Sequence, residues 1–244
     1  MNNSNYYEVY LKRLNRYGGN YQARVQKKRE EEFELYCLKS VYKVSFEFEG
    51  EQQEGTFEKY KQDETETLHY LLTKTSLNIP SGTILMLPDK DDVLKPWMIY
   101  YLEAIKASGY NRYIALKMTH FVSWTDEKGE ERGSWAHLYG QENNMLKDEL
   151  QSRSRMQALY AENLKLSFFI MPLNEHIKRD TYLEIGEAPF KEAYRVTGYD
   201  IHSTPGVEYV SIDPVYLRDN SPVPLQKTKD RNEEDYFWLT GGGN

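Results

Sequence analysis

The chain has 244 residues, a formal net charge of -7 at neutral pH and one cysteine. This length fits one large β domain or two small ones. The acidic balance excludes a chain whose whole surface holds nucleic-acid phosphates, because that grip needs a basic footprint. One cysteine excludes a disulfide framework, and no apolar run approaches the ~18 residues of a membrane-spanning helix. We therefore expect a soluble protein of a reducing compartment, with no secretory signal and no membrane partner.

The first 40 residues predict two helices that form an arm. Tyr6, Tyr10 and Leu14 are spaced to share one helical face, and the glycines at 18 and 19 end this helix. A second helix is predicted from about residue 21 to 39, with Val25, Phe33, Tyr36 and Cys37 on one stripe. Its basic run precedes its acidic run, which is the less favourable order for a helix on its own. We expect this helix to dock either on a neighbouring molecule or on its own β domain.

The middle of the chain predicts short strands rich in tyrosine, of which the chain has 21. Residues 41–49 alternate as a half-buried strand, and a loop is expected over 50–55. A helix is predicted from Asp63, with Leu68, Leu71 and Leu72 beneath it. The further strands are predicted at 83–87, 97–105, 112–124, 132–138, 164–171, 182–185, 190–200 and 207–212, with a turn at 203–206. Residues 141–162 fit either a strand or a helix.

This pattern predicts a mainly β fold, with one or two small β-barrel or sandwich modules, an N-terminal helical arm and an extended C-terminal tail. The expected divisions are an arm over 1–40, a β-rich domain with one short helix over 41–162, a second β module over 163–219 and a tail over 220–244. Pro222 and Pro224 stiffen the start of that tail. Near its end, Tyr236, Phe237 and Trp238 form an aromatic anchor for a partner.

Residues that carry chemistry are scattered. The five histidines lack the spacing of a zinc site, and the sequence contains neither a nucleophile elbow nor a phosphate-binding loop. Asp89, Asp91 and Asp92 lack the glycine and the distal glutamate of a calcium loop. Acidic residues at 63–66 are explained by helix capping. We expect no catalytic, cofactor or metal site, and no enzymatic activity.

Basic residues gather in the first helices, and we expect them to contact either DNA phosphates or an acidic protein surface. The aromatic residues between them have helical spacing, so packing explains them at least as well as base stacking. The candidate interface residues are Tyr6, Tyr10, Arg13, Arg16, Arg24, Tyr236, Phe237 and Trp238.

Several segments resemble neck proteins of tailed bacteriophages, the head-closure or head-tail connector family. They are residues 56–64, 70–73 and 79–85, the pair 97–101 and 113–118, and the pair 168–172 and 194–200. The resemblance extends over about residues 42–218. In that family such segments are strands of β-barrels and sandwiches.

The resemblance implies a homo-oligomeric ring beneath the portal of the capsid, which seals the DNA inside and joins head to tail. The implied partners are the portal protein, a tail or lower-neck protein, and genomic DNA that passes through the lumen without specific binding. The implied location is the neck of the virion, after synthesis in the host cytoplasm. Two alternatives stay open: a tail or baseplate adaptor, and a nucleic-acid-binding β-barrel module that uses the basic arm.

Overall fold

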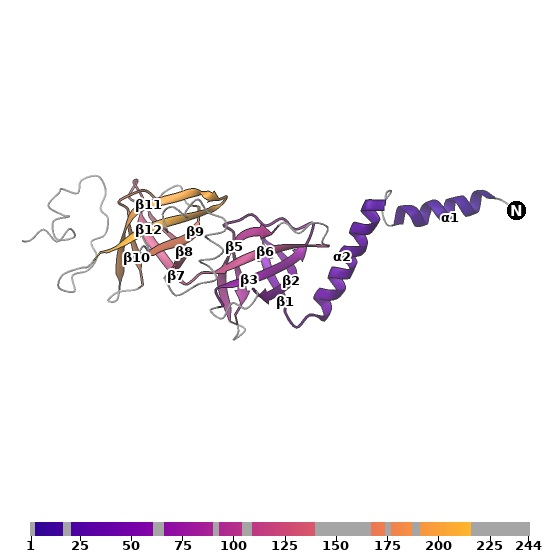
Figure 1. Ribbon diagram of the computed structural model, residues 1–244, viewed down its shortest axis with the longest axis horizontal. Coiled ribbons are helices and arrows are strands. Elements are labelled where there is room, and N and C mark those ends of the chain that lie inside the picture. The colour runs from indigo at the N-terminus through magenta and orange to yellow at the C-terminus, as the bar shows by residue number, and fades with distance from the viewer. Residues whose placement is uncertain are drawn as a thin grey trace, which may run out of the picture.

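The computed structural model describes residues 3–16, 21–60, 66–89, 93–103, 109–139, 167–173, 177–186 and 191–215. These residues form two helices followed by twelve strands, which confirms the predicted mainly β class (Figure 1). The helices are α1 (Asn3–Arg16) and α2 (Tyr21–Lys39). The predicted bounds of the second helix agree with α2. The predicted tail and the ambiguous stretch 141–162 lie outside the described residues.

The first six strands form one antiparallel sheet with the order β1-β2-β3-β6-β5-β4. Their bounds are β1 (Lys43–Phe48), β2 (Glu51–Lys59), β3 (Leu68–Lys74), β4 (Ile84–Pro88), β5 (Leu94–Glu103) and β6 (Tyr110–Lys117). The other six close into a barrel with the order β10-β11-β12-β9-β8-β7. These are β7 (His120–Thr125), β8 (Glu131–Tyr139), β9 (Ser167–Pro172), β10 (Tyr182–Ile185), β11 (Glu192–Thr204) and β12 (Val207–Val215).

The loop predicted over 50–55 is wrong beyond its first residue, because residues 51–55 belong to β2, the partner of β1 in a hairpin. Glu49 and Gly50 have φ angles of 53° and 80°, the left-handed conformation that tight hairpin turns require. The turn therefore takes two residues, and the Glu/Gln-rich stretch that follows pairs immediately. Exposed polar side chains on this edge of the sheet hid the strand from a hydrophobic pattern.

The helix predicted after Asp63 is wrong over its described part, because Leu68–Lys74 is strand β3. This strand pairs with β2 on one side and β6 on the other, so both of its edges are hydrogen-bonded within the sheet. Leu71 packs inside the sheet's own core, while Leu68 and Leu72 on the opposite face enter two other clusters. Their helix-like spacing arises because neighbouring side chains fill different cores.

The long strand predicted over 112–124 is two strands, since β6 ends at Lys117 and β7 begins at His120. β6 belongs to the sheet and β7 to the barrel. The two β modules therefore divide near Met118, whereas the sequence placed the division after residue 162. The turn predicted at 203–206 is confirmed at Pro205 and Gly206, where Gly206 has a φ of 79°, whereas Ser203 and Thr204 belong to β11.

A continuous core joins the two modules. One cluster contains Met98, Tyr100 and Leu116 of the sheet together with Phe168 and Tyr209 of the barrel. At its centre the Tyr100 and Tyr209 hydroxyls are 2.6 Å apart, and Thr204 Oγ1 lies 2.8 Å from Tyr209 Oη. The sheet and the barrel therefore form one packed body.

Candidate functional site

Helix α1 presents an apolar face that is largely exposed. The exposed fraction is 82% for Tyr6 and 54% for Tyr10, and Tyr7, Val9 and Leu11 are exposed beside them. Arg13 and Arg16 lie in the last turns of the same helix. Figure 1 shows α1 directed away from both β modules, at the far end of α2. The structure thus brings four of the predicted interface residues together on one helix.

Helix α2 docks on the sheet of its own chain, which is one of the two placements left open by the sequence. Phe33 and Cys37 are buried against Leu72 of β3, and the Phe33 ring lies 5.3 Å from the Tyr110 ring. Burial raises the pKa of the Cys37 thiol to about 11. Of the predicted stripe, Tyr36 stays largely exposed. The contact is narrow, because few apolar side chains of a long helix enter it.

Polar contacts support this docking along the helix. The Tyr36 hydroxyl donates to Glu58 at 2.7 Å, and this hydrogen bond raises the pKa of the phenol. Lys74 Nζ lies 2.8 Å from the carboxylate of Glu34, and the hydrogen bond between them raises the pKa of Lys74. The Thr75 hydroxyl also donates to Glu30. Because these groups are exposed or half-buried, each adds little, about 0–1 kcal/mol. Apolar packing therefore carries most of the attachment.

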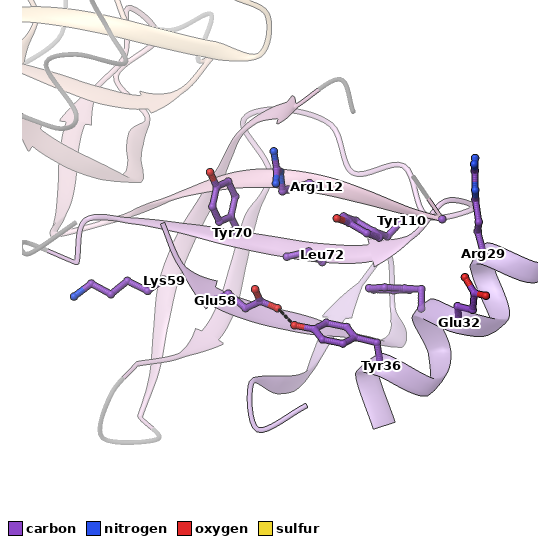
Figure 2. A pocket seen from close by; sticks show the side chains of 11 residues that line it. Arg29, Glu32, Tyr36, Glu58, Lys59, Tyr70, Leu72, Tyr110 and Arg112 are labelled. Carbon is purple, nitrogen blue, oxygen red and sulfur yellow. Dashed lines mark hydrogen bonds between the residues drawn. The ribbon is translucent and has the colours of Figure 1, made fainter. Parts of the chain in front are cut away.

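An open groove of about 670 Å³ lies between α2 and the sheet (Figure 2). Tyr36 and Glu58 line one side, and Tyr70, Tyr110 and Arg112 line the other. The Arg112 guanidinium lies 4.8 Å from the centre of the Tyr70 ring and forms an ion pair of 2.5 Å with Glu103. The charge of Arg112 is thus balanced within the chain, and the walls of the groove combine aromatic rings with charged side chains.

The face of α2 opposite the sheet carries a second apolar surface, which the sequence analysis did not identify. Leu35 and Leu38 are exposed at 55% and 66%, and Val41 and Tyr42, directly after the helix, at 89% and 55%. We call these four residues the outer stripe. The i,i+3 spacing of Leu35 and Leu38 is the sequence signal for its helical part, but the prediction followed Phe33 and Cys37 on the docked face instead.

The other predicted residues are not gathered with α1. Arg24 lies on α2, half-buried, and its Nε has no hydrogen-bond acceptor among the described residues. Tyr236, Phe237 and Trp238 lie outside the described residues. Asp89 forms an ion pair of 2.6 Å with Lys117. This pair gives Asp89 a structural role, and Asp91 and Asp92 also fall outside the described part.

The described residues contain no group of three or more His, Cys, Asp or Glu side chains that is arranged to hold a metal ion. His137 is buried, its Nδ1 lies 2.8 Å from the Lys117 carbonyl oxygen, and burial lowers its pKa to about 4. It is a neutral core histidine. Within the described ranges, neither helix is long and apolar enough to cross a bilayer.

No protein-family model matches this chain, and no curated protein matches it. Among solved structures, the chain is similar to K. pneumonia MrkH in its apo state, with 9% identity over 80% of this chain and 87% of that chain, at a TM-score of 0.25. The complex of K. pneumonia MrkH with c-di-GMP matches with 8% identity over 79% and 87% of the two chains, at a TM-score of 0.24. Scores of this size establish no shared fold and assign no function to this chain.

Proposed function

We propose that this protein is a structural component of the neck of a tailed bacteriophage. In this role, identical copies form a ring beneath the portal, close the DNA-filled head and join it to the tail. The observation that carries the proposal is the apolar face of α1, which includes Tyr6 at 82% exposure on a helix outside the β core. The segments that resemble neck proteins of tailed bacteriophages are the reason for proposing this family among proteins that work by assembly.

Helix α1 depends on packing for its stability. A helix of 14 residues is marginal in water without tertiary packing. Burial of a large apolar side chain contributes about 1.5–3 kcal/mol, so covering this face supplies the missing stabilisation. A partner surface is therefore the expected environment of α1, as in a protein that works by assembly.

Two further features suit a connector. The continuous core between the sheet and the barrel provides a rigid body on which the arm is mounted. The net charge of -7 repels phosphates, so an acidic lumen lets DNA pass without holding it. Two alternative functions, a tail or baseplate adaptor and a nucleic-acid-binding module, are distinguished from this proposal by the experiment that follows.

The test uses the purified full-length chain. We expect light scattering and electron microscopy to show closed rings, and these rings to attach to portal-bearing capsids. A variant that lacks residues 1–19 is expected to lose ring formation or attachment; normal rings and normal attachment without these residues refute the role of the arm. Retention on DNA at low salt that weakens as salt rises replaces the proposal with the nucleic-acid-binding module. Attachment to tails or baseplates but not to capsids replaces it with the adaptor.

A further inference from the structure

We infer that α1 of one copy packs on the outer stripe of α2 in a second copy, antiparallel to it. This inference rests on the proposed function and names the contact that closes the ring. Two exposed apolar faces, one on each helix of the same arm, are the starting observation. A single contact between copies covers both of them.

The chain's own α1 does not reach the outer stripe when it folds back on α2. Helix α1 has 14 residues, which at ~1.5 Å per residue span about 21 Å. Residues 17–20 connect the two helices, so a folded-back α1 begins beside Tyr21. It then runs alongside the next 14 residues of α2 and reaches its own end near Glu34. The outer stripe starts at Leu35, beyond that reach.

The charges that α1 meets differ between the two arrangements. Residues 3–16 contain three cations, Lys12, Arg13 and Arg16, and one anion, Glu8, in a chain whose net charge is -7. Folding back places these cations beside the basic run 24–29 of α2, and like charges this close repel. Glu31 and Glu32, which are both exposed, precede the outer stripe, so α1 from another copy meets opposite charges there.

The direction of α1 on its partner follows from where its apolar and basic residues lie. With the helices antiparallel, Tyr10 lies beside Leu38 of the second copy, and Tyr6 lies at the end of its α2, towards the turn that holds Val41 and Tyr42. The basic end of α1 then falls over Glu31, which is exposed, and its neighbours in the acidic run. In the parallel direction the basic end instead approaches Lys39. Apolar match and charge match agree only in the antiparallel direction.

This contact joins different surfaces on the two copies, α1 on one and α2 on the other. Contacts of this heterologous kind repeat from copy to copy and produce a ring when the rotation closes. Each copy then uses its α1 on one neighbour and offers its outer stripe to the other neighbour. In a closed ring, every apolar face of α1 and every outer stripe is therefore covered.

The experiment is disulfide cross-linking of the full-length chain in a Cys37→Ala background. One preparation carries Tyr10→Cys, the other carries Leu38→Cys, and the two are mixed and oxidised. We expect covalent dimers in the mixture, and a ladder of covalent oligomers when one chain carries both cysteines. The matched control replaces Leu38→Cys with Leu94→Cys, another exposed leucine, at 55% exposure on β5, and is expected to give few dimers. Cross-linking of the double variant within single chains overturns the inference.

A charge exchange gives a second measurement. The pair Lys12→Glu and Arg13→Glu, or the pair Glu31→Lys and Glu32→Lys at exposed positions of α2, is expected to weaken self-association at least about tenfold. All four changes in one chain are expected to restore it, because the attraction is re-established with signs reversed. Circular dichroism checks that the helices and strands are intact in each variant. Failure of the fourfold variant to recover association, with the fold intact, also counts against the contact.

The outcomes separate this inference from the proposed function. A chain that stays monomeric at every concentration removes both. Rings that form normally without the cross-link remove only the proposed contact. Cross-linked particles that light scattering shows to be two-fold dimers retain the contact between copies and remove the ring.

Discussion

The hydroxyl of Tyr209 is expected to stabilise the joint between the sheet and the barrel. Its Oη lies 2.6 Å from the hydroxyl of Tyr100 and 2.8 Å from that of Thr204. Both tyrosines are 1% exposed, so water does not replace a lost partner. Tyr209→Phe keeps the ring and removes the hydroxyl. The buried hydroxyls of Tyr100 and Thr204 then lose this hydrogen-bond partner, which lowers the free energy of unfolding by about 1–3 kcal/mol. For a chain of this size, a loss of about 2 kcal/mol lowers the Tm by about 4–8 °C.

Urea denaturation and thermal unfolding measure this loss at a fixed protein concentration. The control is Tyr199→Phe, an exposed tyrosine that is expected to change the free energy of unfolding by less than about 0.5 kcal/mol. Tyr100→Phe combined with Tyr209→Phe is expected to cost less than the sum of the two single changes, because both ends of the bond then leave together. A Tyr209→Phe variant as stable as the unchanged chain refutes the reasoning.

Gly206→Ala is expected to lower the free energy of unfolding by at least about 3 kcal/mol in denaturation experiments, because a φ of 79° disfavours a side chain and the added Cβ overlaps the Ser81 carbonyl. The control is Gly198→Ala, whose Cβ meets nothing within 4 Å and which is expected to be nearly neutral. Burial lowers the pKa of His137 from its ordinary 6.5 to about 4, so the unfolded chain binds its proton first as pH falls. Stability is expected to drop by about 2 kcal/mol between pH 7 and pH 5, and a His137→Asn variant that keeps the full drop contradicts this assignment. The Cys37 thiol, with its pKa raised from 9.0 to about 11, is expected to react with a thiol reagent at pH 8 about a hundredfold more slowly than in the denatured chain. Equal rates in the two states show that α2 is not docked on the sheet.

The sequence predicted the elements whose signals are local. The bounds of α2, the strand at β10 and the Pro-Gly turn before β12 depend on spacing and turn chemistry within a few residues. The prediction for residues 68–74 was wrong because the burial of β3 is set by strands and a helix from other parts of the chain. Leu68, Leu71 and Leu72 enter three different clusters, and no local pattern encodes that division.

Of the candidate site, the sequence predicted the apolar face of α1, which has a local signal, but not the outer stripe. The exposed face of α1 followed from the spacing of Tyr6 and Tyr10, since nothing else in the described fold is needed to expose it. The outer stripe on α2 depends on which side of the helix the sheet occupies. Phe33 and Cys37 take the docked side, and this leaves Leu35 and Leu38 outside. That choice becomes visible only when the sheet is in place.

The shared core has a mechanical consequence. The covalent link between the two β modules runs through Met118 and Thr119, but the side chains packed around Tyr100 and Tyr209 bridge them as well. A pulling force on the N-terminal arm is therefore transmitted from the sheet to the barrel through packed side chains, and not through the two linking residues alone. We expect stretching of a single molecule between its ends to break this region in one abrupt step, without a low-force extension that separates sheet from barrel.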